Sequence, residues 1–211
     1  SLHFAHPVAP RTDAPNHQHF FSWRLDFDVD GGANRLVELN TRNAQDALRD
    51  SSGEWFAMEE RPLRTEGDAQ RDIDFATARR WIVTNNGTKN PLGQPTGYAI
   101  VPGENAPALQ TPASAPRRRA PFLGHHLWAT RHAPSQMYAS GEWIGLPGRD
   151  EGVASWSADN ESLVDQDLVL WYTHSVVHLP RPEDWPIMPA HTAGFRLVPV
   201  GFFGSNPTLP R

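Results

Sequence analysis

Hydrophobic and polar residues alternate along much of this chain with a period of two, which is typical of β-strands that bury one face. The clearest run covers residues 21–29, where polar side chains separate five apolar ones at odd positions. These apolar residues are Phe21, Trp23, Leu25, Phe27 and Val29. The sequence Asp30-Gly31-Gly32 predicts a turn, and Asn34–Thr41 is then predicted as the return strand of a hairpin.

Further runs of the same kind predict five more strands. These are Arg80–Thr84, Thr96–Pro102, His126–His132, Leu168–Leu179 and Gly194–Phe203. One short helix is predicted at Ala44–Arg49, and the Pro- and Ala-rich residues 106–121 are expected to form an extended connection. The pattern therefore predicts an all-β protein, a large antiparallel β-sandwich in which residues 1–211 form one unit.

A histidine pair opens the first predicted strand and is the main candidate for chemistry. His17 and His19 are two residues apart, so both imidazoles project from one face of a strand and can reach one metal ion. His178, in a strand near the other end of the chain, can provide a third nitrogen. Three imidazoles and an open position suit copper or a catalytic zinc ion. With ten histidines in the chain, a lone His-x-His also arises by chance.

Strand parity predicts the surroundings of these histidines. His17 and His19 share odd numbering with the apolar residues of 21–29, and His178 shares parity with apolar residues of its own strand, so we expect a buried imidazole cluster. His174 has the same parity as His178 and is a candidate neighbour of the site. His125 and His126 point to opposite faces, which favours structural or solvent-facing roles.

A second candidate site consists of carboxylates on the opposite strand faces. Asp26 and Asp28 lie in one strand, while Asp165 and Asp167 precede another. Together they can hold a hard cation through carboxylate and backbone oxygens, although an Asp-x-Asp pair is more often a solvated strand face. We therefore predict two separate sites, one of imidazoles and one of carboxylates.

Composition narrows the classes of function. The net charge of −5 argues against a nucleic-acid partner, and the absence of cysteine removes disulfides, thiolate metal sites and cysteine nucleophiles. No apolar run approaches membrane-spanning length, so no membrane partner is expected, and the lack of a signal pattern at the start favours the cytoplasm. Neither a Gly-x-Ser-x-Gly elbow nor a Gly-rich phosphate loop occurs, which disfavours serine hydrolases and nucleotide-binding proteins.

Several sequence motifs, in this order, resemble the C-terminal part of the catalytic domain of copper-containing primary amine oxidases. The motifs are Asn16-His17-Gln18-His19-Phe20-Phe21 with Arg24-Leu25-Asp26-Phe27-Asp28-Val29-Asp30-Gly31, then Leu127-Trp128-Ala129-Thr130-Arg131, Asp165-Gln166-Asp167-Leu168-Val169-Leu170-Trp171-Tyr172-Thr173, and finally His178-Leu179-Pro180-Arg181-Pro182-Glu183-Asp184-Trp185-Pro186-Ile187-Met188-Pro189. Gly194-Phe195 and Phe202-Phe203 close the pattern. The resemblance covers essentially the whole chain, and its last long run is the most specific part.

This resemblance implies roles for individual residues. His17, His19 and His178 would be the copper ligands, and Met188 would lie close to the copper without binding it. A peripheral calcium or sodium site would be formed by Asp26, the Phe27 carbonyl, Asp28, Asp167 and the Leu168 carbonyl. A second calcium site of some members would correspond to Glu66, the Trp156 carbonyl, Asp159 and Glu161. The family forms homodimers of large β-sandwich subunits, so a homodimer is expected.

The family oxidises primary amines with oxygen, releasing aldehyde, ammonia and hydrogen peroxide, and uses copper together with topaquinone. This quinone is made from a tyrosine in an Asn-Tyr-Asp/Glu motif upstream of the His-x-His pair, and the catalytic aspartate lies further upstream. The tyrosines here, Tyr98, Tyr138 and Tyr172, do not fit that motif. We therefore expect an incomplete, copper-binding portion of the domain, with topaquinone formed from a tyrosine outside this chain, and no activity in the chain alone.

Two alternatives remain open at this level. The first is a non-catalytic metal-binding β-domain, or a subunit that complements a missing N-terminal half. The second is a zinc hydratase or hydrolase that uses the same three imidazoles. It is disfavoured because no candidate general base adjoins the histidines in the sequence.

Overall fold

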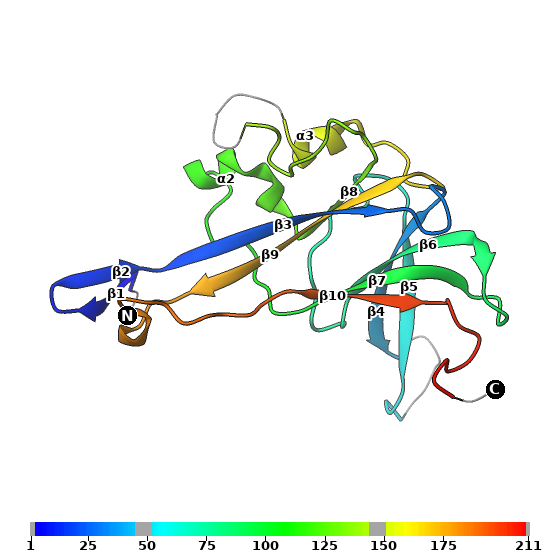
Figure 1. Cartoon of the computed structure of the whole chain (residues 1–211), viewed down its shortest axis with the longest axis horizontal. Coiled ribbons are helices and arrows are strands. Elements are labelled where there is room, and N and C mark those ends of the chain that lie inside the picture. The colour runs from blue at the N-terminus through cyan, green and yellow to red at the C-terminus, as the bar shows by residue number, and fades with distance from the viewer. Residues whose placement is uncertain (1–2, 45–51, 144–150, 210–211) are drawn as a thin grey trace.

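Two antiparallel sheets face each other and a third forms a separate hairpin in the computed structural model, which describes residues 3–44, 52–143 and 151–209 (Figure 1). The five-stranded sheet has the order β10-β7-β6-β4-β5. Its strands are β4 (Arg35–Asn43), β5 (Phe56–Leu63), β6 (Arg80–Lys89), β7 (Pro95–Pro102) and β10 (Phe195–Val200). The three-stranded sheet has the order β3-β9-β8, with β3 at His17–Phe27, β8 at Leu127–Arg131 and β9 at Leu168–His178.

The smaller elements are a hairpin and short helices. The hairpin pairs β1 (Ala5–Ala9) with β2 (Thr12–Pro15). The helices are α2 (Ala115–Arg119), α3 (Val153–Trp156) and the 3-10 turns η1 (Pro121–Gly124), η2 (Ser157–Asp159) and η3 (Pro182–Asp184). Within the described ranges, no helix has the length and apolar character needed to cross a membrane.

The hydrophobic core lies between the two larger sheets. Leu36, Trp81 and Ile100 from the five-stranded sheet pack in one cluster with apolar residues of the three-stranded sheet. The latter include Phe27, Leu127, Leu168, Leu170 and Tyr172. Fully burying one such aliphatic or aromatic side chain stabilises the fold by about 1.5–3 kcal/mol. The predicted all-β antiparallel sandwich is confirmed, and each predicted strand has a counterpart.

The predicted hairpin between residues 21–29 and 34–41 is wrong. β3 pairs with β9 along its whole length, from His17 opposite His178 to Phe27 opposite Leu168. β4 instead pairs with β5 and β6 in the other sheet. The intervening turn exists, with positive φ at Asp30 and Gly31, but it carries the chain from one sheet to the other. A turn motif predicts a change of chain direction but does not identify the strand with which the next strand pairs.

Two further expectations concern the connections. The extended connection over 106–121 is wrong in part, because it contains helix α2, whose Pro116 lies in the first turn, where a missing N–H leaves no hydrogen bond unmade. The helix predicted at Ala44–Arg49 cannot be compared: Ala44 is a turn residue and residues 45–49 lie outside the described ranges. Strands β1, β2 and β5 lack a clear alternating pattern and were not predicted.

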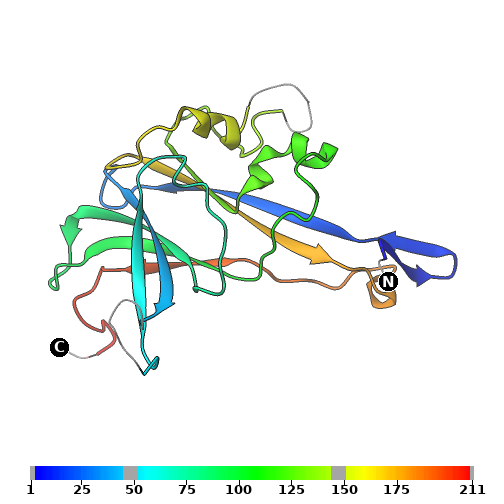
Figure 2. The ribbon, with the colours of Figure 1, turned by 180° about the vertical axis from the view of Figure 1, so that it is seen from behind.

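Strands β3 and β9 form a two-stranded ribbon that runs past the five-stranded sheet toward the β1–β2 hairpin (Figures 1 and 2). Along the same face of β3, Phe27 is 7% exposed, whereas Trp23 and Phe21 are 49% and 48% exposed. The covering sheet is therefore lost toward the outer end of the ribbon. His17, His19 and His178 all lie at that end.

Candidate metal centre

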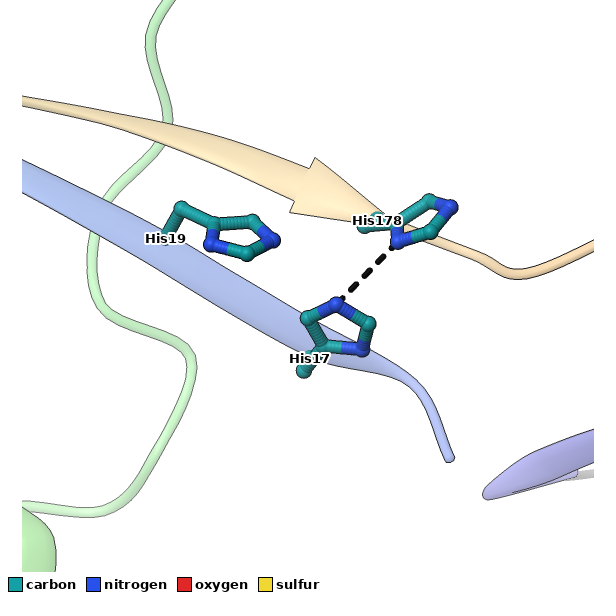
Figure 3. Close-up of side chains that lie close together, drawn as sticks. All are labelled: His17, His19 and His178. Carbon is teal, nitrogen blue, oxygen red and sulfur yellow. Dashed lines mark hydrogen bonds between the residues drawn. The ribbon is translucent and has the colours of Figure 1, made fainter. Parts of the chain in front are cut away.

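The register of β3 and β9 places the three predicted histidines on one face of the ribbon. His17 lies directly opposite His178, and His19 lies two residues further along β3. The three rings converge from both strands (Figure 3). Their ring centroids are 4.7 Å apart for His17 and His178, and 4.9 Å apart for His17 and His19. One nitrogen from each ring lies within 4.8 Å of the others.

The partner of the His17 ring fixes its tautomer. Nδ1 of His17 lies 2.9 Å from the carbonyl oxygen of Pro15. A carbonyl oxygen only accepts hydrogen bonds, so Nδ1 carries the proton and donates it. Nε2 of His17 therefore presents a lone pair, and it lies 3.1 Å from Nδ1 of His178.

The His178 ring is held in the complementary way by a carboxylate. Nε2 of His178 lies 3.1 Å from Oδ2 of Asp184, which is in the 3-10 turn η3. The hydrogen bond from Arg181, followed by that from His178, lowers the pKa of Asp184 to about 2, so its carboxylate accepts hydrogen bonds only. The proton of His178 is accordingly on Nε2, and its Nδ1 presents a lone pair to the centre.

Two lone pairs facing each other at 3.1 Å repel unless a proton or a metal ion lies between them, and the separation is compatible with a metal ion. With metal–nitrogen bonds of about 2.05 Å, a nitrogen–nitrogen separation of 3.1 Å corresponds to an angle of about 98° at the metal. Imidazole nitrogen is a ligand of borderline softness that suits copper and zinc. His17, His19 and His178 together would offer a set of nitrogen donors that suits a copper ion.

The predicted burial of this cluster is wrong. His17 and His19 are exposed, and His178 retains 15% side-chain exposure. Parity placed the three rings on one face correctly, but that face is covered only where the five-stranded sheet lies over it. Met188, expected near the metal, lines a cavity of about 290 Å³ together with His178 and Asp184.

The family assignment rests on two kinds of comparison. The family model described as copper amine oxidase, enzyme domain, matches residues 1–210. The chain belongs to the copper amine oxidase family. It is 41% identical over 206 residues to histamine oxidase from Arthrobacter globiformis, covering 98% of this chain and 30% of that protein. It is 42% identical over 207 residues to the peroxisomal copper-containing diamine oxidase 1 of Nicotiana tabacum, covering 96% of this chain and 26% of that protein.

A solved structure of the family agrees with the fold. The copper-containing benzylamine oxidase from Hansenula polymorpha matches with a TM-score of 0.89 and 28% identity, over 98% of this chain and 33% of that chain. The copper amine oxidase chain thus spans about a third or less of the length of these relatives.

The other histidines of this copper amine oxidase chain have partners of their own. Nδ1 of His174 accepts a hydrogen bond of 3.3 Å from the Trp23 indole, and the His174 ring stacks on Phe21. Nδ1 of His125 and Nδ1 of His126 lie 3.0 and 2.8 Å from the two carboxylate oxygens of Asp72. These contacts give His125 and His126 a structural role in linking two segments of the chain.

The peripheral carboxylates lie near one another without forming a tight cluster. Phe27 and Leu168 are opposite each other in the β3–β9 register, which brings the neighbouring Asp26, Asp28 and Asp167 to one end of the ribbon. His132 lies between two of these carboxylates, with its ring nitrogens 3.6 Å from Asp26 and 3.7 Å from Asp167. Asp165, a further candidate, instead forms a two-pronged ion pair with Arg35.

A second carboxylate cluster is tighter. Glu66, Asp159 and Glu161 each bring an oxygen to within 4.8 Å of the others. Burial, together with the neighbouring Asp159 carboxyl, raises the pKa of Glu66 to about 7. Among the described residues, this cluster and the three histidines are the groups of three or more metal-ligating side chains that gather this closely.

Sequence reasoning missed Asp184 and the Pro15 carbonyl, which contact the rings of His178 and His17. Pro15 directly precedes the Asn16-His17 segment, and Asp184 lies six residues after His178 in the long C-terminal motif. The short distance in sequence between Asp184 and His178 is a signal that could have identified this carboxylate, because ligating histidines commonly donate their other N–H to such a group.

Proposed function

We propose that this chain supplies the copper site of a primary amine oxidase, an enzyme that converts a primary amine, oxygen and water into aldehyde, ammonia and hydrogen peroxide. The observation that carries the proposal is the convergence of three imidazole rings from opposite ends of the chain. The names of the relatives, histamine oxidase and diamine oxidase, support the same reaction class. His17, His19 and His178 are the proposed copper ligands.

The residues of this chain prepare the site by holding three imidazoles close together. A copper ion bound there supplies redox and Lewis-acid chemistry for oxygen. The Pro15 carbonyl holds the proton of His17 at Nδ1, which keeps Nε2 free for the metal. The antiparallel pairing of β3 with β9 fixes the separation between His17 and His178, because these residues are register partners.

The rest of the proposed active site comes from outside these residues. The tyrosines Tyr98, Tyr138 and Tyr172 do not lie in an Asn-Tyr-Asp/Glu motif, so topaquinone is proposed to derive from a tyrosine outside this chain. Tyr172 is fully buried, and burial raises its pKa to about 12, both of which disfavour oxidation of this ring. The chain alone is therefore proposed to be inactive toward amines.

Further proposals concern cations and assembly. Asp26, Asp28, Asp167 and the carbonyls of Phe27 and Leu168 would hold a peripheral calcium or sodium ion. Glu66, Asp159, Glu161 and the Trp156 carbonyl would hold a second calcium ion, which would relieve the repulsion among the gathered carboxylates. The intact enzyme is proposed to be a homodimer.

The proposal is tested by measuring metal content and amine oxidation in the same preparations. The 211-residue chain should bind about one copper ion, show no quinone absorbance and produce no amine-dependent peroxide. A protein that also carries the tyrosine-bearing segment should gain both the absorbance and the activity. Turnover of an amine by the chain alone, or exclusive binding of zinc from a copper–zinc mixture, would contradict the proposal.

A further inference from the structure

We propose that Asp184 is a positioning residue that selects the nitrogen through which His178 binds the metal. By holding the proton of His178 at Nε2, its carboxylate leaves Nδ1 free to face the nitrogens of His17 and His19. This inference rests on the proposed copper site and adds a residue that lies outside the set of three ligands.

The geometry allows only one orientation of the His178 ring to serve the centre. Nδ1 of His178 faces Nε2 of His17 at 3.1 Å, while Nε2 of His178 faces Oδ2 of Asp184 at the same separation. The nitrogen that faces the centre is therefore bonded to Cγ, the ring carbon that carries Cβ, in His178, whereas in His17 it is the nitrogen farther from Cβ. Because the two nitrogens of a free imidazole compete for one proton, a fixed acceptor on one side decides which nitrogen has the lone pair.

Asp184 is itself held firmly enough to act in this way. Its side chain is 7% exposed, and Oδ2 accepts a hydrogen bond of 2.9 Å from the backbone N–H of Arg181. The Arg181 side chain adds a contact of 3.2 Å from Nη2 to Oδ1, although that side chain is 65% exposed. The turn η3 thus fixes the carboxylate through its backbone, and the arginine reinforces it.

The substitution Asp184→Asn separates a tautomer effect from a steric one. An asparagine amide has nearly the same shape, but its nitrogen can donate to Nε2 of His178 and drive the proton to Nδ1, the metal-facing atom. Such a change of acceptor into donor is known to leave a site intact while placing the histidine in the wrong tautomer. Oδ2 of Asp184 faces both Nε2 of His178 and the backbone N–H of Arg181, so an amide nitrogen turned toward His178 also gives up the Arg181 hydrogen bond. An amide oxygen left in that place is a weaker acceptor than the carboxylate, so either orientation weakens the hold on the proton at Nε2.

Glu183 provides a matched control because it is the neighbouring carboxylate in the same turn and is exposed. Glu183→Gln changes the net charge by the same amount as Asp184→Asn without touching His178. Arg181→Ala is a second control: it removes the side-chain contacts but keeps the backbone N–H that holds Oδ2.

The experiment compares the wild-type chain with these variants by two measurements. Proton–nitrogen correlation spectra of the metal-free protein report the tautomer of His178, and competition titration with a chelator reports the affinity for Cu(II). The wild type, E183Q and R181A should all show the proton of His178 on Nε2. D184N should shift it toward Nδ1 and weaken copper binding by about 10–100-fold, the usual cost of losing such a partner.

Each outcome decides one of the two proposals. If the wild type does not bind copper, the proposed function fails whatever Asp184 does. If the wild type binds copper and D184N binds it equally well, or if His178 of the wild type carries its proton on Nδ1, the role of Asp184 is refuted. The wild-type spectrum needs no variant, so the second test holds even where D184N does not fold.

Discussion

A buried carboxylate, Glu38 on β4, joins the five-stranded sheet to the sheet that carries the proposed copper site. Its side chain is 1% exposed and accepts hydrogen bonds of 2.7 and 2.8 Å from the Arg71 guanidinium, and one of 3.1 Å from the Trp81 indole. Arg79 lies 3.4 Å away. The backbone of Arg71 pairs in both directions with that of Leu127 on β8, so Glu38 links the five-stranded sheet to the sheet that contains His178.

The substitution Glu38→Gln keeps the shape of this side chain but removes the charge that two arginines face. Breaking a buried ion pair by changing one partner typically costs about 3–5 kcal/mol. The side chains of Arg71 and Arg79 retain 21% and 15% exposure, which lets water reach the unpaired cations and favours the lower end, about 3 kcal/mol. In a chain of this size that loss corresponds to a Tm lower by roughly 6–12 °C.

Thermal and urea unfolding, followed by circular dichroism, measure this change. Asp165→Asn is the matched control, because it removes the carboxylate of a two-pronged pair with Arg35 whose side chains are 41% and 48% exposed. The exposed pair should contribute little, so the control should hardly change the midpoint. Equal midpoints for E38Q and D165N would refute the claim that Glu38 ties the two sheets together.

The remaining predictions concern metals and pH. His19→Gln should weaken copper binding in a chelator competition, whereas His174→Gln, on the same face but bonded to Trp23, should leave it unchanged; equal losses would mean that the ligand set is misassigned. Burial lowers the pKa of His174 in the folded chain. Below a pH of about 6.5 the unfolded chain therefore takes up a proton that the folded chain does not, and stability should fall as the pH drops below that value. H174Q should flatten that part of the curve in thermal melts, and an unchanged slope would contradict the assignment. Calcium should raise the Tm of the wild type, and Glu66→Gln should reduce the rise; an equal rise in both would exclude the Glu66 cluster as a calcium site.

The fold class could be predicted from sequence because alternation of apolar residues depends only on strand geometry and burial of one face. The pairing partner of each strand could not be predicted. Strand β3, for example, pairs with β9, and this pairing joins segments from opposite ends of the chain and leaves no local signal in the sequence. The turn at Asp30-Gly31 was detected, but the same backbone conformation serves a hairpin and a crossing between sheets. Strand β5 was missed because both of its faces are largely exposed, which removes the alternating pattern.

The candidate site, like the fold, could be predicted from the sequence only in part. The spacing of His17 and His19 places two rings on one face of any strand, so their convergence followed from local geometry. Their exposure did not, because it depends on where the five-stranded sheet ends relative to the ribbon. The role of Asp184 was also hidden, since it requires the turn η3 to fold back toward His178.

Pulsed electron-spin resonance of the protein loaded with one equivalent of Cu(II) tests the central claim most directly, because it counts the imidazoles bound to the ion. The wild type should show three coordinated imidazoles, and His178→Ala should show two, which proves that opposite ends of the chain share one copper. A spectrum that does not change when residue 178 is replaced would contradict the account.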